Sequence, residues 1–328
     1  MRADLFLVEH GFATTRSQAQ RLIGSGVQWR VVVDEAEVAA PWKRVAKNGD
    51  EIVDNAEVEV LDNTEAKYIS RGGLKLEGAL RATGLDVTGL RCLDVGQSTG
   101  GFTDCLLQHG AAQVVGVDVG HGQLHASMHD DDRVVGLEGI NARSLTATDL
   151  TAACAFKIAA TGQFNAENEQ AINPVFDFLT GDLSFISLTL VLPAVVRLLK
   201  ADGHLLMLVK PQFELQPGQI GKGGIVRDAV HFEFVEKRLR DCCAELGVEV
   251  LQWIPSVIEG GDGNREFFIH GKRGNDVGLG DKPLPAAPPR KAVKRTPRAE
   301  TRALHAAHED SEAAHAGQHG PARRKQKD

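Results

Sequence analysis

Residues 92–118 read C-L-D-V-G-Q-S-T-G-G-F-T-D-C-L-L-Q-H-G-A-A-Q-V-V-G-V-D, and this order predicts one βαβ unit. The apolar run Cys92–Val95 is typical of a buried strand, a glycine-rich turn follows, and Phe102–Gln108 has a helical composition. A second apolar run, Gln113–Val117, ends on Asp118. An acid at the tip of that strand accepts hydrogen bonds from ribose hydroxyls. The unit therefore predicts a Rossmann-like α/β domain that binds a nucleoside-bearing cofactor.

The spacing of the glycines distinguishes between cofactors. A dinucleotide fingerprint needs G-x-G-x-x-G, whereas this turn has G-x-x-x-G-G with Asp94 shortly before its first glycine. An acid at that place repels a pyrophosphate and suits the cationic sulfonium and α-amino groups of S-adenosylmethionine, so the methyl donor is favoured over NAD. The expected cofactor contacts are Asp94, Gly96, Ser98, Gly100, Gly101 and Asp118.

Composition limits the class of protein. The 328 residues leave room for two domains, and 42% of them are hydrophobic, which is enough for real cores. No segment approaches the ~20 apolar residues of a membrane helix, and the N-terminus lacks the apolar core of a signal peptide. The five cysteines show no C-x-x-C spacing. We therefore expect a reduced cytoplasmic protein without structural zinc.

Charge is distributed unevenly along the chain. The net charge is −7, but residues 273–328 carry 12 Lys and Arg against 7 Asp and Glu, so residues 1–272 carry about −12. If the chain binds a nucleic acid, the contacts must come from local basic patches and not from the whole surface. The chain divides into a small Arg- and Val-rich part (1–62), the part with the βαβ unit (63–272), and a basic tail (273–328) whose composition predicts disorder.

The first part predicts a small α+β domain. Asp4–His10 fits a short helix, and a capping box at Thr15–Gln18 opens a second helix that ends at Gly24. Trp29–Val33 and Glu51–Val53 fit strands. This order resembles the RNA-binding fold of ribosomal protein S4; the alternative is an ordinary small domain with a solvated basic helix. The resemblance implies RNA contacts by Arg2, Arg16, Gln20 and Arg21.

Four charged residues lie where the second part predicts strand edges or a helix start. Lys75 follows the loop S-R-G-G, which also offers Arg71 to RNA, and Asp182 ends the strand that begins at Phe176. Lys210 follows the strand Leu205–Val209, and Glu266 precedes the strand Phe267–His270. A buried helix is expected at Leu188–Leu199. Each charge alone fits a surface position, but together they resemble the Lys-Asp-Lys-Glu tetrad of FtsJ-like ribose 2′-O-methyltransferases.

The motifs S-R-G-G-L-K-L, L-D-V-G-Q-S-T-G-G-F-T-D, D-L-S-F-I-S-L, V-K-P-Q-F-E and G-N-R-E-F-F together resemble the haemolysin A (TlyA) family of rRNA 2′-O-methyltransferases. The resemblance runs from Met1 to about Gly271. It implies methylation of cytidine ribose in ribosomal RNA of one or both subunits, and it places Asn141 near the adenine. The segment 155–173, the tail after Lys272 and the region W-R-V-V-V-D-E-A-E-V depart from the family pattern.

The expected chemistry needs a group that handles a ribose proton. A lysine beside the hydroxyl stabilises the developing alkoxide and accepts its proton, a role we assign to Lys210. Asp182 then orients Lys210, while Lys75 and Glu266 hold the hydroxyl and the lysine in register. No metal is required. The recurrence of His121, His125 and His129 is too common a spacing to indicate a metal site.

Three other functions remain open from the residues. A non-enzymatic RNA-binding ribosome-assembly factor would keep the fold without the chemistry. A membrane-lytic protein would need an apolar or amphipathic basic segment, which is not visible. A base methyltransferase often carries an Asn/Asp-Pro-Pro-aromatic strand end, where this chain has D-L-S-F. The target nucleotide and the oligomeric state are left open by the sequence.

Overall fold

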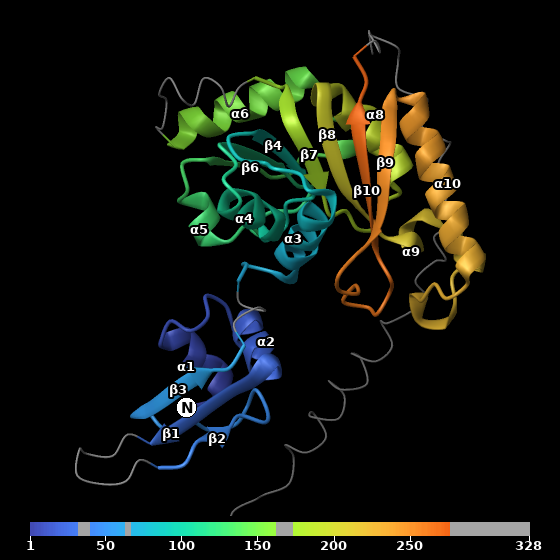
Figure 1. Cartoon of the computed structure of the whole chain (residues 1–328). Coiled ribbons are helices and arrows are strands. Elements are labelled where there is room, and N and C mark those ends of the chain that lie inside the picture. The colour runs from blue at the N-terminus through green and yellow to red at the C-terminus, as the bar shows by residue number, and fades with distance from the viewer. Residues whose placement is uncertain (32–39, 63–66, 162–172, 276–328) are drawn as a thin grey trace, which may run out of the picture. The chain divides into compact units, whose positions relative to one another are not determined.

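The computed structural model describes residues 1–31, 40–62, 67–161 and 173–275. Figure 1 shows a small N-terminal part and a larger α/β part, which are described separately below. Most of the segment 155–173 that departs from the family pattern, and the tail beyond residue 275, lie outside the described residues. No helix in the described ranges has the length and the apolar character needed to cross a bilayer.

The N-terminal part is a three-stranded antiparallel sheet with two helices, as an α+β domain requires. The sheet order is β2-β1-β3. Its elements are α1 (Ala3–Glu9), α2 (Arg16–Gly26), β1 (Val27–Val31), β2 (Lys43–Arg44) and β3 (Ala56–Val60). Phe6 and Leu7 of α1 pack with Leu22 of α2 and with Ile52 in one buried core.

Both predicted N-terminal helices are confirmed, but one predicted strand is wrong. Thr15 caps α2 by accepting from the Gln18 N–H, and the helix continues two residues past Gly24. The region Glu51–Val53 makes only an isolated bridge between Glu51 and Arg2, and Ile52 is used as a core residue instead. The pairing strand is Ala56–Val60, where alternating valines face the helices and Glu57 and Glu59 face away.

The larger part contains a seven-stranded sheet with the order β6-β5-β4-β7-β8-β10-β9. The strand β10 runs antiparallel to both of its neighbours. The strands are β4 (Arg91–Val95), β5 (Gln113–Val117), β6 (Val134–Leu137), β7 (Phe176–Gly181), β8 (Leu199–Val209), β9 (Val248–Pro255) and β10 (Phe267–Arg273). The predicted βαβ unit and the strands before Asp182 and Lys210 are confirmed.

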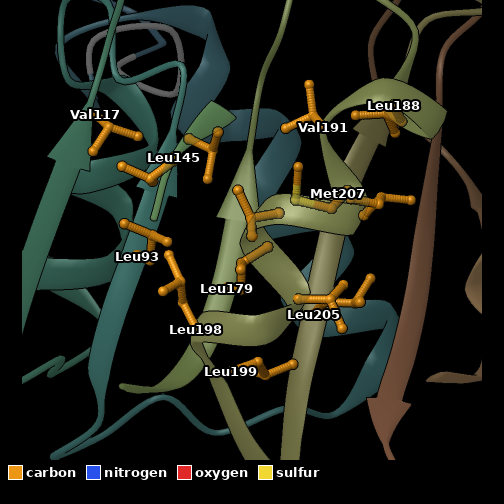
Figure 2. Packing of buried hydrophobic residues seen from close by; sticks show 14 of the residues in the cluster. Leu93, Val117, Leu145, Leu179, Leu188, Val191, Leu198, Leu199, Leu205 and Met207 are labelled. Atoms are coloured by element: carbon orange, nitrogen blue, oxygen red, sulfur yellow. The ribbon is translucent and has the colours of Figure 1, made fainter. Parts of the chain in front are cut away.

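Helices cover both faces of this sheet (Figure 1). One face packs on α3 (Arg71–Thr83), α4 (Gly101–Gln108) and α5 (Ala126–His129). The other packs on α6 (Ala147–Thr161), α8 (Leu192–Val195) and α10 (Ala229–Glu245). Alternate strand residues enter the two cores: Cys92 lies in the first and Leu93 in the second. Figure 2 shows Leu93, Leu179 and Leu205, from three neighbouring strands, in that second core.

The predicted helix Leu188–Leu199 is wrong as one element, although its burial is correct. The segment forms a 3₁₀ turn (Leu188–Leu190), the short helix α8 and a second 3₁₀ turn (Val196–Leu198), and Leu199 already begins β8. Pro193 lacks an N–H and its ring clashes with the preceding turn, so a continuous helix cannot pass through it. Apolar side chains of the segment are nonetheless buried (Figure 2).

Chain order reverses at β4 and creates a crevice there. The chain passes from β4 to β5 and β6 on one side, and then returns to β7 on the other side of β4. Ligands of open α/β sheets bind at the carboxyl ends of the strands at such a reversal. The turn after β4 and the residues after β5 and β7 therefore form the expected site.

Candidate functional site

Two adjoining cavities lie at the carboxyl edge of the sheet. The larger has a volume of about 440 Å³, and its wall includes residues that follow β4, β5 and β7. The smaller has a volume of about 180 Å³ and reaches Lys210. Gly96, Ser98, Asp182 and Ser184 line both. The larger cavity has the size of an ordinary small-molecule site, and the smaller one beside it is lined by Asp182 and Lys210, two of the four charged residues predicted to be catalytic.

The glycine turn is held against its neighbours too closely for side chains. Gly96 has φ +85°, and a Cβ there would lie 2.7 Å from the Asp182 carbonyl oxygen. A Cβ on Gly101, the first residue of α4, would lie 2.0 Å from Ser70 Oγ. Gly100 caps α4 with φ +96°. The turn leaves its backbone directly on the cavity wall, because Gly96 and Gly101 line it.

Gly96→Ala is expected to lower the affinity for S-adenosylhomocysteine at least tenfold and to reduce stability. The new methyl group would meet the Asp182 backbone, and the left-handed conformation would strain any L residue. Isothermal titration of the purified variant measures the affinity. Gly84→Ala, at the open C-cap of α3, has a similar positive φ but nothing within 4 Å. It is the matched control, and equal losses in both variants would contradict the prediction.

Asp94 lies beneath the turn and not on the wall of either cavity. Its side chain is fully buried, and Oδ2 accepts from Thr103 Oγ at 2.8 Å, while Gln97 Nε2 donates to that same hydroxyl oxygen. Oδ1 has no hydrogen-bond partner within the described residues. Burial raises the pKa of Asp94 to about 7. A nearby cation would keep this carboxyl ionised, which suits a cationic cofactor.

Asp118 and Asn141 both line the larger cavity, as their predicted roles require. Asp118 follows β5 and accepts from the backbone N–H groups of Ser98 and Gly120, each at 2.7 Å. Asn141 accepts from the Arg143 N–H at 3.1 Å. These contacts fix the two carboxyl-edge loops in place, and Ser98, with φ +48°, belongs to the same network.

The Lys210 ammonium is held at the mouth of the smaller cavity. Its Nζ forms an ion pair with Asp182, and it donates to Ser184 Oγ at 2.9 Å. Asp182 and Lys210 follow the adjacent strands β7 and β8, which brings them together at one edge. The lysine side chain is mostly buried, at 12% exposure. The structure thus brings this predicted pair together and adds Ser184, which sequence analysis missed.

Lys75 and Glu266 form a second ion pair, with Nζ 2.5 Å from Oε2. The lysine comes from α3, and the glutamate immediately precedes β10, whose antiparallel direction brings its start to the carboxyl edge. Both side chains are buried, at 9% and 2% exposure. Burial raises the pKa of Glu266, and the Lys75 ammonium opposes that rise. The charge of Lys210 lowers the pKa of Glu266, and the charge of Asp182 raises it.

Asn264, a residue that sequence analysis missed, holds the turn that carries Glu266. Asn264 is fully buried; its side chain accepts from the Val226 N–H and donates to the Gly224 carbonyl and to Asp262. It ties the glycine-rich loop 221–226 to the turn that carries Glu266. The signal in the sequence was the Asn of the motif G-N-R-E directly before a predicted strand, because an Asn that becomes buried at such a place bonds to the backbone around it.

Three of the four predicted RNA-contacting residues of the N-terminal part donate to one buried carboxylate. Asp4 accepts from Arg2 Nε and Nη2, from Arg16 Nε at 2.7 Å and from Gln20 Nε2 at 3.2 Å. The Arg2 guanidinium holds the pKa of the Asp4 carboxyl well below its usual range. Arg2 and Arg16 remain about half exposed, whereas Arg21 is partly buried.

Arg71 and the possible metal ligands lie outside the two ion pairs. Arg71 begins α3 and donates to the Glu259 carbonyl at 3.2 Å, and it remains exposed near the cavities. Across the described ranges, no group of three or more His, Cys, Asp or Glu is arranged to hold a metal ion.

Comparisons with known proteins agree with this geometry. A family model described as FtsJ-like methyltransferase matches residues 68–273. The 16S/23S rRNA (cytidine-2'-O)-methyltransferase TlyA of Mycobacterium tuberculosis (strain ATCC 25618 / H37Rv) is 39% identical over 289 residues, which cover 86% of this chain and 94% of that protein. Hemolysin A of Brachyspira hyodysenteriae is 34% identical over 270 residues, which cover 82% of this chain and 99% of that protein.

A solved hemolysin structure from Streptococcus thermophilus is 36% identical, with a TM-score of 0.59, and the match covers 84% of this chain and 91% of that one. The family model spans more than half of this chain, and these relatives align over more than four fifths of it. The chain therefore belongs to the haemolysin A (TlyA) family of rRNA 2′-O-methyltransferases, with an FtsJ-like methyltransferase domain whose cofactor is S-adenosylmethionine.

Proposed function

We propose that the chain transfers a methyl group from S-adenosylmethionine to the 2′-oxygen of a cytidine ribose in ribosomal RNA. The observation that carries the proposal is the Lys210–Asp182 ion pair on the wall of the smaller cavity, together with the buried ion pair of Lys75 and Glu266 at the same edge of the sheet. The printed activity of the Mycobacterium tuberculosis relative, cytidine-2′-O methylation of rRNA, supports the same assignment. The reaction would take place in the cytoplasm, where ribosomes are assembled.

The larger cavity suits the nucleoside end of the cofactor. Asp118 and Asn141 offer oxygen acceptors on its wall, and Gly96 lets bare backbone form part of that wall, where a Cβ would meet the Asp182 carbonyl oxygen. Asp94 lies beneath the turn and off both cavity walls, so it would favour the cationic end of the cofactor through its charge and not through a direct contact. When bound there, S-adenosylmethionine supplies an electrophilic methyl carbon.

Lys210 handles the proton of the target hydroxyl in this proposal. Lys210 acts as a neutral amine in this step, after the ammonium of the resting ion pair has released a proton to solvent. The hydroxyl proton then passes to Lys210 Nζ as the 2′-oxygen takes the methyl group, and the carbon–sulfur bond breaks to release S-adenosylhomocysteine. The Asp182 carboxylate and Ser184 hold that nitrogen in place. Lys75 and Glu266 keep the hydroxyl aligned with the methyl group, and alignment of two bound reactants supplies much of the rate.

An exposed aromatic ring suits an unstacked target base. Phe185 is 90% exposed, lines the larger cavity and lies next to Ser184. Its ring contacts Phe213, with 5.0 Å between centroids. Sequence-specific RNA recognition uses such rings for bases that have left the helix stack. The proposal therefore places the target nucleotide in a loop or a flipped-out position.

The N-terminal part would bind the RNA outside the target nucleotide. We propose that residues 1–62 form an S4-like RNA-binding domain and that residues 63–272 carry catalysis. The exposed guanidinium groups of Arg2 and Arg16 suit phosphates, since a guanidinium presents several donors in a fixed plane. Gln20, Arg21 and, in the catalytic part, Arg71 would add polar contacts to the same RNA.

Asp4→Asn tests the RNA face of the N-terminal part. We expect the affinity for ribosomal RNA to fall roughly tenfold although a negative charge is removed, because Arg2 and Arg16 lose the carboxylate that orients them. Glu9→Gln, at the exposed end of α1, makes the same charge change away from the network. It should bind RNA as well as the wild type or better. Filter binding at several salt concentrations measures both, and tighter binding by Asp4→Asn would contradict the orienting role.

Methyl transfer from labelled S-adenosylmethionine to purified ribosomal subunits and free rRNA tests the whole proposal. Digestion to nucleosides should place the label on the 2′-oxygen of cytidine. Label on a base would overturn the assignment. Absence of label, with cofactor and RNA still bound and with subunits that lack the modification as substrate, would favour a ribosome-assembly factor.

A further inference from the structure

Glu214 is a buried carboxylate that the proposed chemistry does not use. It ends the short helix α9 (Pro211–Glu214), four residues after Lys210, and its exposure is 3%. Oε2 accepts from Ser187 Oγ at 2.5 Å, and Oε1 accepts from the Leu188 N–H at 2.7 Å. Within the described residues no ion pair reaches this carboxylate, and Arg238 donates to the Glu214 backbone carbonyl. Burial raises the pKa of the side chain, and the charge of Arg238 lowers it. A buried carboxylate held by neutral donors is costly, so its position needs a reason.

The two hydrogen bonds of Glu214 hold the end of a turn whose residues line the larger cavity. This turn, residues 182–187, begins with Asp182, whose N–H donates to the Val95 carbonyl at 3.1 Å. Ser184 in its middle accepts from Lys210. Phe185 has φ +64°, a strained conformation for a residue with a side chain. Strain of this kind persists only where the surroundings over-determine the backbone.

The turn is fixed at both of its ends and in its middle. The first end is bound to β4 through Asp182, and the other end is bound to Glu214 through Ser187 and Leu188. The Phe185 ring lies against Phe213, the residue before Glu214. The segment 210–214 therefore contacts the turn through a catalytic ion pair, an aromatic contact and a carboxylate grip.

Arg238 of α10 also connects the segment 210–214 with the segment 182–189, and the contact between these two segments forms a joint. Its Nη1 donates to the Glu214 carbonyl oxygen at 2.7 Å, and its Nη2 donates to Thr189 Oγ at 3.1 Å. The side chain thus bridges the segment after β8 and the segment after β7, as Glu214 does. The joint is therefore stabilised both by Arg238 from the helix α10 and by Glu214 from within the joint.

We propose that Glu214 is a positioning residue for methyl transfer: it holds the turn 182–187 against the segment 210–214, so that Asp182, Ser184 and Phe185 face Lys210 and the target nucleotide in one fixed geometry. This role rests on the proposed function, because it acts through Lys210 and Asp182. A purely structural role, capping the 3₁₀ turn Leu188–Leu190, is the alternative that the test must separate.

The kinetic test compares Glu214→Ala with Glu214→Gln. We expect Glu214→Ala to lower kcat about 100-fold per folded molecule, because a displacement of about 1 Å between reacting groups has that effect. The dissociation constant for S-adenosylhomocysteine should rise by a much smaller factor than kcat falls, because Asp118 and Asn141 are untouched, although residues 182–186 also line the larger cavity. Glu214→Gln should recover kcat to within about fivefold of the wild type, because its amide can accept from the Leu188 N–H and donate to Ser187 Oγ.

A stability-matched control separates positioning from simple structural loss. Val235→Ala removes a fully buried side chain of α10 that makes none of the hydrogen bonds between residues 182–189 and 210–214. It should lose stability and keep its kcat per folded molecule. If Glu214→Ala kept wild-type kcat, or if Val235→Ala lost kcat to the same extent, the positioning role would be overturned.

Amide hydrogen exchange tests the joint without any turnover. Glu214→Ala should speed exchange over residues 182–188 at least tenfold, whereas Val235→Ala should speed it mainly in α10. Unchanged exchange over residues 182–188 would show that Glu214 does not hold the turn, even if the enzyme were inactive on the chosen RNA. Failure of the proposed function is a different result, because the wild type itself would then transfer no methyl group to ribose.

Discussion

Lys210→Ala should lower methyl transfer about 1,000-fold while leaving the affinity for S-adenosylhomocysteine within about threefold of the wild type. Lys210 is the group that meets the hydroxyl proton, and alanine neither accepts a proton nor stabilises the developing oxyanion. Most of the cofactor contacts lie elsewhere, on the larger cavity, which Lys210 does not line. Single-turnover transfer of labelled methyl to ribosomal subunits, beside titration of S-adenosylhomocysteine, measures both quantities.

The same strand supplies a matched control for this substitution. Lys200, at the opposite end of β8, forms an ion pair with Asp177 of β7 at 2.5 Å, as Lys210 does with Asp182. Lys200→Ala makes the same chemical change at the edge away from the cavities, and it should keep wild-type turnover. Lys210→Arg keeps the charge but holds its proton at any accessible pH, so it should remain slow. Wild-type turnover by either Lys210 variant would exclude the assigned role.

Local pattern was sufficient to predict the elements that form the site. The run Cys92–Asp118 alternates apolar strands, glycines and a helix within 27 residues, so its fold depends on neighbours in sequence. Charges that end apolar strands were correctly placed at one edge, because parallel strands all present their carboxyl ends there. Lys210 and Asp182 follow from that rule alone.

Contacts between distant segments were not predictable in the same way. Glu214 holds Ser187, and Asn264 holds Val226, across 27 and 38 residues, and neither pairing leaves a periodic signal. Pro193 was visible, yet the apolar composition around it favoured a single helix over three short turns. The strand Ala56–Val60 was missed because its alternating glutamates resemble a solvated segment unless a pairing partner is known.

Breaking the Lys75–Glu266 pair should reduce both stability and activity, and the two effects can be separated. Either Lys75→Ala or Glu266→Ala leaves an uncompensated charge in a buried site, which costs about 3–5 kcal/mol in the free energy of unfolding. By comparison, Lys67→Ala breaks a pair with Glu77 in which the lysine is 42% exposed. That variant should lose no more than about 1 kcal/mol. Urea unfolding monitored by circular dichroism gives the three values.

The double variant Lys75→Met with Glu266→Leu decides whether the pair serves catalysis or only the fold. Apolar side chains of similar volume often replace a buried ion pair without loss of stability, so the double variant should regain most of what each single variant loses. It should nevertheless transfer methyl groups at least about 100-fold more slowly, because no charged group remains to align the ribose hydroxyl beside Lys210. Recovery of turnover together with stability would show that the pair only maintains the fold. Slow turnover in a stable, cofactor-binding double variant would leave alignment of the substrate as the function of these two charges.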